Sequence, residues 1–247
     1  MVFELIPFVG LLVGTFCVAY FVAAIGPTGG MQLAVTSATV PATIIIPFHA
    51  FISAFSAIFR VAGLWRDVDR GFVARFIVPS LAFTGLAVLI GRFTGFEWIR
   101  LLIGAYILLD VSGFWRLFSE RIGSVSMNAY AIGAVTGFVT AFIGASGPLL
   151  WVLMKDDFAS KEALSGTHSA CLVAQHFSKI LAFGLIGFSI FDYWPVLLAA
   201  VAASGLGTYL GQKRLRSFDE ATYKKLLNIA LLISGSLIIV LGLVELV

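Results

Sequence analysis

Charge is scarce in this sequence: 12% of its 247 residues are Asp, Glu, Lys or Arg, whereas 60% are hydrophobic. Such a composition excludes an ordinary water-soluble domain. The net charge of +3 is too small to indicate nucleic-acid binding, and the basic residues gather at the ends of apolar segments. The composition therefore predicts a polytopic membrane protein whose surroundings are the lipid bilayer.

Cysteine and histidine are also few, which leaves little room for metal or redox chemistry. Cys17 and Cys171 both lie within apolar segments, where a small buried side chain is expected rather than a disulfide. The three histidines are nowhere four residues apart on one helix, as a zinc helix requires. There is no GxxxxGK[ST] loop, so ATP is not the direct energy source. We expect no metal, no cofactor and no enzymatic activity.

Apolar runs long enough to cross a bilayer, about 20 residues each, follow one another along the chain. They occupy residues 5–25, 41–65, 71–91, 98–118, 160–187, 190–211 and 222–246. Two further pieces, 31–40 and 129–154, are shorter or interrupted. Because the linkers are brief, we expect one all-α transmembrane domain over residues 1–247.

The two halves of the chain resemble each other. The stretch AAIGPTGG at 23–30 is echoed by TAFIGASGP at 140–148. Further on, His49 pairs with His168 and Arg60 with Lys179, and the offset between mates grows in one direction, as short insertions would make it. The sequence predicts a duplicated unit, with repeat one at 1–120 and repeat two at 127–247.

Each repeat carries a Gly-rich break after its first helix. The breaks consist of Gly26, Pro27, Thr28, Gly29 and Gly30 in repeat one, and of Gly144, Ala145, Ser146, Gly147 and Pro148 in repeat two. Backbone groups freed in hydrocarbon are costly, so protein or a wet cavity must surround such breaks. The alternative is close helix packing through small residues, which would need no proline.

The distribution of Lys and Arg predicts how the repeats are oriented. Simple alternation of crossings divides the cations indecisively between the two faces. If each break is the tip of a re-entrant hairpin, twelve cations share one face: Arg66, Arg70, Arg75, Arg116, Arg121, Lys155, Lys161, Lys213, Arg214, Arg216, Lys224 and Lys225. Only Arg92 and Arg100 lie opposite. The positive-inside rule favours this arrangement, which makes the two units inverted repeats with both termini outside.

Polar residues form one stripe in each repeat, with members at i, i+4, i+7 and i+11 of a helix. The stripes are His49, Ser53, Ser56 and Arg60, and then His168, Leu172, Gln175 and Lys179. Ionisable groups inside a membrane commonly mark a solute or proton path. The alternatives are that the two cations reach headgroups or nearby carbonyls and that the histidines are satisfied core residues. His176 has no mate and is expected to be structural.

Together these residues predict a site for a small oxyanion. The start of each hairpin's second limb presents unpaired amides, which with the helix dipole favour an anion. Thr28 and Ser146 add hydroxyl donors at equivalent places, and the glycines let a solute approach the backbone. Imidazoles and paired cations complete the donors that an oxyanion needs.

A duplicated membrane unit with IGPTGG and IGASGP breaks resembles the sulfite exporter TauE/SafE family of permeases over essentially the whole chain. The resemblance implies transport of sulfite, sulfoacetate or another organosulfonate across the cytoplasmic membrane of a prokaryote, usually as export. Family members often have further glycines where this chain has Pro27, Ala145 and Ser146. The prediction is a secondary transporter that works by alternating access, with a histidine able to link transport to protons. A passive anion channel built from the same parts is the alternative.

Overall fold

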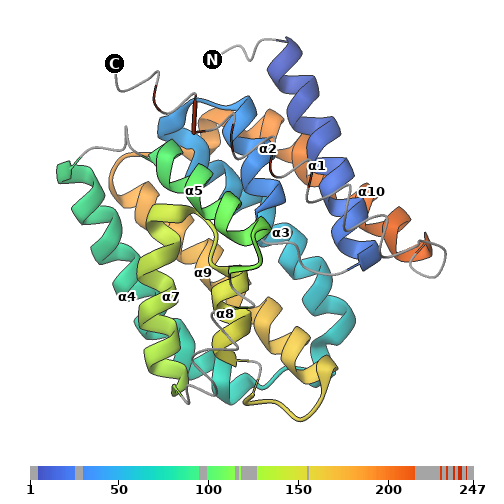
Figure 1. Cartoon of the computed structure of the whole chain (residues 1–247), viewed down its shortest axis with the longest axis vertical. Coiled ribbons are helices and arrows are strands. Elements are labelled where there is room, and N and C mark those ends of the chain that lie inside the picture. Colours follow the sequence, from blue (N-terminus) through green and yellow to red (C-terminus); the bar gives the residue numbers. More distant parts are fainter. Residues whose placement is uncertain are drawn as a thin grey trace.

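Helices make up nearly all of the described chain, and no strand occurs in it (Figure 1). The computed structural model describes residues 5–25, 30–94, 99–114, 117, 127–154 and 156–214, and singly 229, 232, 236, 239, 240 and 243. The first half contains α1 (Leu5–Ile25), α2 (Met31–Thr39), η1 (Ala42–Ile44), α3 (Ile45–Leu64), η2 (Trp65–Asp67), α4 (Arg70–Thr94) and α5 (Ile99–Val111). The second half contains α7 (Ala129–Ile143), α8 (Gly147–Met154), α9 (Lys161–Leu185), η3 (Ile190–Tyr193) and α10 (Trp194–Arg214).

Within the described residues, four helical segments are long and apolar enough to cross a membrane. They are Leu5–Val22, Ala42–Asp67, Arg70–Gly91 and Ile190–Gly211, as the sequence predicted. α9 has 25 residues, but the polar residues along it lower its hydropathy. The predicted segment at 222–246 lies almost entirely outside the described residues. The all-helical membrane fold is confirmed.

Two pairs of helices pack along much of their length, α4 with α7 and α1 with α10. α4 and α7 run parallel, since Phe76 faces Gly133 and Ser80 faces Gly137 one turn further along. Thr84 donates a hydrogen bond of 2.9 Å to the carbonyl of Gly137. Close approach therefore occurs at glycines inside α7, the role that small residues have in membrane bundles.

The short helix α2 folds back against α1. Gly10 and Gly14 on α1 face Thr39 and Val35 on α2 respectively, so the two helices are antiparallel. The side-chain amide of Gln32 also donates a 3.0 Å hydrogen bond to the hydroxyl of Thr15. Helices α1 and α2 thus form a hairpin whose second limb is only nine residues long.

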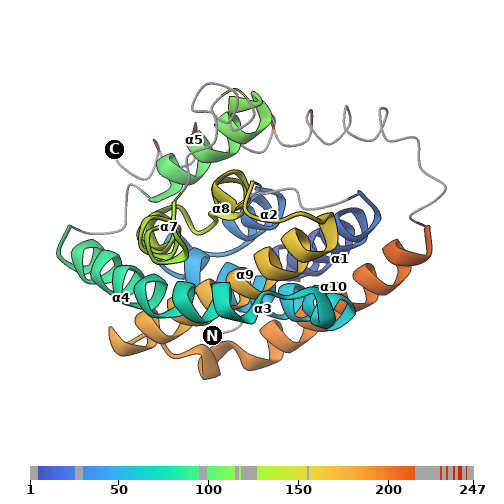
Figure 2. The same cartoon turned by 90° about the horizontal axis from the view of Figure 1, so that it is seen from below.

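At the centre of the bundle, α3 and α9 cross in opposite directions. Gly166 near the start of α9 faces Leu64 at the end of α3, whereas His176 faces His49. In the view of Figure 2, α2 and α8 lie near the middle, with α4 and α7 to one side and α1 and α10 to the other.

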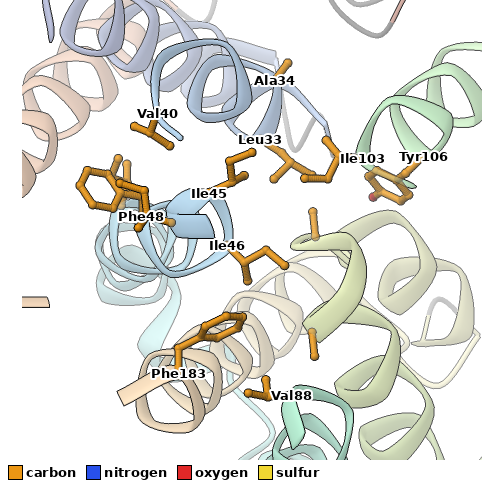
Figure 3. Packing of buried hydrophobic residues seen from close by; sticks show 14 of the residues in the cluster. Leu33, Ala34, Val40, Ile45, Ile46, Phe48, Val88, Ile103, Tyr106 and Phe183 are labelled. Carbon is orange, nitrogen blue, oxygen red and sulfur yellow. The ribbon is translucent and has the colours of Figure 1, made fainter. Parts of the chain in front are cut away.

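An apolar cluster joins these elements (Figure 3). Leu33 of α2, Ile45 and Ile46 of α3, and Ile103 of α5 are all at most 1% exposed. Ala145, in the second Gly-rich break, belongs to the same cluster. The short helix of the first half and the break of the second half therefore lie against each other in the interior.

We predict that Gly137→Ala destabilises the protein. A Cβ atom there would lie 2.6 Å from the carbonyl oxygen of Ser80 and 2.8 Å from its Cα, and backbone atoms cannot move aside cheaply. The expected loss of unfolding free energy is about 1–3 kcal/mol, typical of overpacking. A lower melting temperature in detergent would show it. Gly85→Ala on α4 is the control, because no atom lies within 4 Å of its added methyl; equal melting temperatures for the two variants would contradict this account of α4–α7 packing.

Candidate functional site

The predicted break in the second half is present between α7 and α8. α7 ends at Ile143, and Gly144 adopts the left-handed conformation (φ +83°) with its amide donating 2.9 Å to the carbonyl of Thr140. A Cβ at Gly144 would meet Leu33, so both its conformation and its packing require glycine. α8 begins at Gly147. At its start the amide of Leu150 donates a 2.8 Å hydrogen bond to the carbonyl of Ser146.

The corresponding break in the first half falls mainly outside the described residues, which omit Gly26, Pro27, Thr28 and Gly29. Gly30 is buried, and its carbonyl accepts a 2.8 Å hydrogen bond from the amide of Ala34 in α2. In the second break Pro148 lies in the first turn of α8, where a missing N–H costs nothing.

Lys179 connects α9 to the end of α7. Its side chain is fully buried, and Nζ donates to the hydroxyl of Thr140 at 3.2 Å and to the carbonyl of Gly144. Both acceptors lie at the carboxyl end of α7, where the helix dipole favours a cation. No carboxylate in the described part of the chain pairs with it. Lys179 therefore binds a nearby carbonyl and does not reach towards the headgroups.

A chain of hydrogen bonds ties Ser146 to the same helices. Its hydroxyl donates 2.7 Å to Oε1 of Gln175, whose Nε2 donates 2.7 Å to the hydroxyl of Thr136. Thr136 in turn donates to the carbonyl of Ile132 at 2.6 Å. Ser146, Gln175 and Thr136 are at most 1% exposed. Ser146 and Gln175, which the sequence predicted to lie in the site, are therefore both hydrogen-bonded to other protein side chains in this conformation.

His168 holds the start of α8. Its Nε2 donates a 3.0 Å hydrogen bond to the carbonyl of Gly147, because a carbonyl can only accept. Its ring meets the edge of Trp151, also on α8, with centroids 5.2 Å apart. The imidazole is thus fixed between α9 and the second limb of the break.

On α3 the predicted polar stripe forms two neighbouring pairs. The hydroxyl of Ser53 lies 3.4–3.5 Å from the ring nitrogens of His49, and the Arg60 guanidinium donates 3.1 Å to the hydroxyl of Ser56. His49 is 3% exposed and meets the ring of His176 edge-on, at 5.6 Å between centroids. The i, i+4 spacing read from the sequence is realised along α3.

The antiparallel crossing brings each stripe histidine near the cation of the other helix. Lys179 interacts electrostatically with His49, and Arg60 with His168. All four groups interact with His176, which sequence reasoning set aside because it lacks a mate. No spacing within one helix could have identified His176, since its surroundings come from α3. Thr136 and Thr140, four residues apart just before the break, were also missed.

In the described residues no group of three or more His, Cys, Asp or Glu side chains is placed to hold a metal ion. The polar groups brought together are amides, hydroxyls, imidazoles and two cations. Such a set suits an anion. Apolar helices of membrane-crossing length around this interior define a multi-pass membrane protein with a buried cationic site.

The chain belongs to the Sulfite exporter TauE/SafE family, whose family model matches residues 11–238. It is therefore a membrane transporter of the family that moves sulfur-containing anions. Neither the comparison with curated proteins nor the comparison with solved structures found a significant match.

We predict that Gln175→Leu lowers stability in the absence of any added anion. The change removes the amide that bonds to Thr136 and leaves the buried hydroxyl of Ser146 without its acceptor, which costs about 1–3 kcal/mol. Chemical or thermal unfolding in detergent measures the loss. Ser178→Ala is the matched control on the same helix, because among the described residues its hydroxyl bonds only to the carbonyl of Ala174, within α9 itself. A Gln175→Leu protein as stable as the control would show that the hydrogen-bonded chain contributes little.

Proposed function

We propose that the protein is a secondary transporter that exports a small sulfur oxyanion, such as sulfite or sulfoacetate, across the cytoplasmic membrane of a prokaryote. The observation that carries the proposal is the placement of histidines near cations where α3 packs against α9, with Lys179 fully buried and without a carboxylate partner among the described residues. A buried cation without a counter-ion is expensive, and a transported anion would supply the missing charge.

The substrate site is proposed to include the two breaks and the two polar stripes. Its residues are Gly26, Pro27, Thr28, Gly29, Gly30, His49, Ser53, Arg60, Gly144, Ala145, Ser146, Gly147, Pro148, His168, Gln175 and Lys179. The contact between Gly144 and Leu33 supports this grouping, since it brings α2 against the second break. One side of that break is apolar, so the anion would approach from the side of Ser146 and Lys179.

Inverted repeats are proposed as the basis of transport. The unit α1–α4 would correspond to α7–α10, and exchanging the units turns the α4–α7 pair into α10–α1, which are the two most extensively packed pairs. The same exchange turns the His49–Lys179 pair into His168–Arg60. Rocking of one unit against the other would open the site alternately to the two sides of the membrane.

The buried site favours a carrier over a channel. His49, His168, Ser146, Gln175 and Lys179 are all at most 3% exposed, so a solute must wait for a conformational change. In a passive channel the same groups would line a continuous path. Protons are the proposed coupling ion, because imidazoles change charge between pH 5 and 8.

We predict that Lys179→Met abolishes anion transport while the protein still folds and inserts into the membrane. Methionine fills a similar volume without a charge, but it leaves the carbonyl of Gly144 without this donor, so a loss of unfolding free energy of about 1–3 kcal/mol is expected. The measurement is counterflow in proteoliposomes: labelled sulfite or sulfoacetate outside, unlabelled anion inside. Wild type should show accelerated exchange, and Arg60→Ala should be impaired as well.

The control for this assay is Ser178→Ala, which should exchange at the wild-type rate. If Lys179→Met and Arg60→Ala both exchange normally, the proposed role of the two cations is wrong. Conductance at channel rates, with no counterflow, would favour the passive channel.

A second prediction concerns orientation. Asp67 and Phe191 are exposed and follow the carboxyl ends of the antiparallel helices α3 and α9. In a background with Cys17 and Cys171 replaced by alanine, Asp67→Cys should react with an impermeant thiol reagent only from the cytoplasm, and Phe191→Cys only from outside. The orientation follows from the arginines around Asp67. Labelling of both cysteines from one face would contradict the proposed topology.

A further inference from the structure

His176 is the buried histidine with an unsatisfied nitrogen. Its side chain is 5% exposed, and Nδ1 has no hydrogen-bond partner among the described residues. Buried polar side chains nearly always have a partner, so an orphaned nitrogen indicates a ligand or a second state. The other two histidines differ, since Nε2 of His168 binds the carbonyl of Gly147 and His49 lies beside the hydroxyl of Ser53.

The charged and titratable groups around His176 come from two helices. His49 and Arg60 face it from α3, and His168 and Lys179 lie along its own helix α9. Within the described parts of α4, α7 and α8, which also pack against α9, no further charged group interacts with it. Both cations of the site therefore lie around His176, and no carboxylate of the described residues does.

We propose that His176 binds the transported anion through Nδ1 and takes up a proton together with it. This inference rests on the proposed function and names the group that couples anion to proton. In the empty site an added proton on the imidazole would be repelled by Arg60 and Lys179. A bound anion removes that repulsion and accepts a hydrogen bond from Nδ1–H, so each of the two ligands favours binding of the other.

The proton comes from the aqueous phase open to the site and leaves with the anion on the opposite side. No covalent bond of the anion forms or breaks, and one imidazole N–H bond forms on entry and breaks on release. For a monoanion the pair carries no net charge, so its movement is independent of the membrane potential, whereas a dianion moving with one proton would still carry one negative charge.

The position of His176 would let one imidazole act in both the inward-open and the outward-open state of the transporter. By the offset that relates His49 to His168, its counterpart in the first repeat is Ala57, which carries no ionisable group. The two stripes supply matched pairs, whereas His176 is a single imidazole beside the crossing of α3 and α9. A single coupling group near the interface between the units can be exposed to either side as they rock.

The experiment is isothermal titration of the purified full-length protein with sulfoacetate, repeated in two buffers of different ionisation enthalpy to count protons taken up. Sulfite is the second probe. Wild type should take up a proton on binding, and its affinity for sulfoacetate should fall as the pH rises. His176→Leu should weaken binding on the order of 10–100-fold, the range expected for a lost hydrogen bond to a charged group.

His176→Asn separates a binding role from a structural one. Its amide N–H lies where Nδ1 was, so affinity should stay within about tenfold of wild type, but proton uptake and pH dependence should disappear. Ser178→Ala, two residues away, should behave as wild type. Wild-type affinity and proton uptake in both His176 variants would overturn the role of His176 alone, whereas a wild type that binds neither sulfoacetate nor sulfite would overturn the proposed function as well.

Discussion

The site depends on one interaction, in which the buried Lys179 stabilises the interrupted end of α7 and the end of α7 stabilises the charge of Lys179. Ending α7 inside the protein leaves carbonyls without intrahelical donors, and in hydrocarbon no water can satisfy them. Lys179 supplies donors to Gly144 and Thr140 at that end, and the carbonyl and the helix dipole in turn stabilise its charge. The left-handed conformation of Gly144 turns its carbonyl away from the helical ladder, so this position tolerates no other residue without strain.

The helices, the second break and the polar stripes could be predicted from the sequence, because each depends on residues that are close together along the chain. The period of the stripes identified which face of a helix His49 and Lys179 occupy, and glycine beside proline identified where α7 stops. The sequence could not predict which helix packs against each stripe. That arrangement is set by close approaches such as Gly166 to Leu64, and it alone brings His49 to Lys179 and surrounds His176.

The glycines of this chain have two distinct physical roles. Gly133 and Gly137 let α4 approach α7, and Gly207 does the same between α10 and Phe16 of α1. These positions lie within helices and need only the absence of a side chain. Gly144 provides a left-handed backbone conformation in addition to close packing against Leu33, whereas at Gly147 no atom lies within 4 Å of an added Cβ. Packing through small residues thus accounts for the glycines in the helix interiors, but it does not account for the backbone conformation of Gly144 or for Gly147.

Among the described residues no carboxylate lies beside Lys179, and this determines what kind of site Lys179 can form. An aspartate at hydrogen-bonding distance would satisfy the lysine permanently, and an incoming anion would then have to compete with a covalently tethered rival at high effective concentration. Neutral carbonyl and hydroxyl acceptors hold the ammonium group in place without cancelling its charge. Each such bond contributes about 1.5–3 kcal/mol net, little enough to be exchanged when a solute enters. In the proposed transport cycle the site therefore stays cationic because its charge is only partly neutralised, and release of the anion leaves Lys179 with its carbonyl and hydroxyl acceptors.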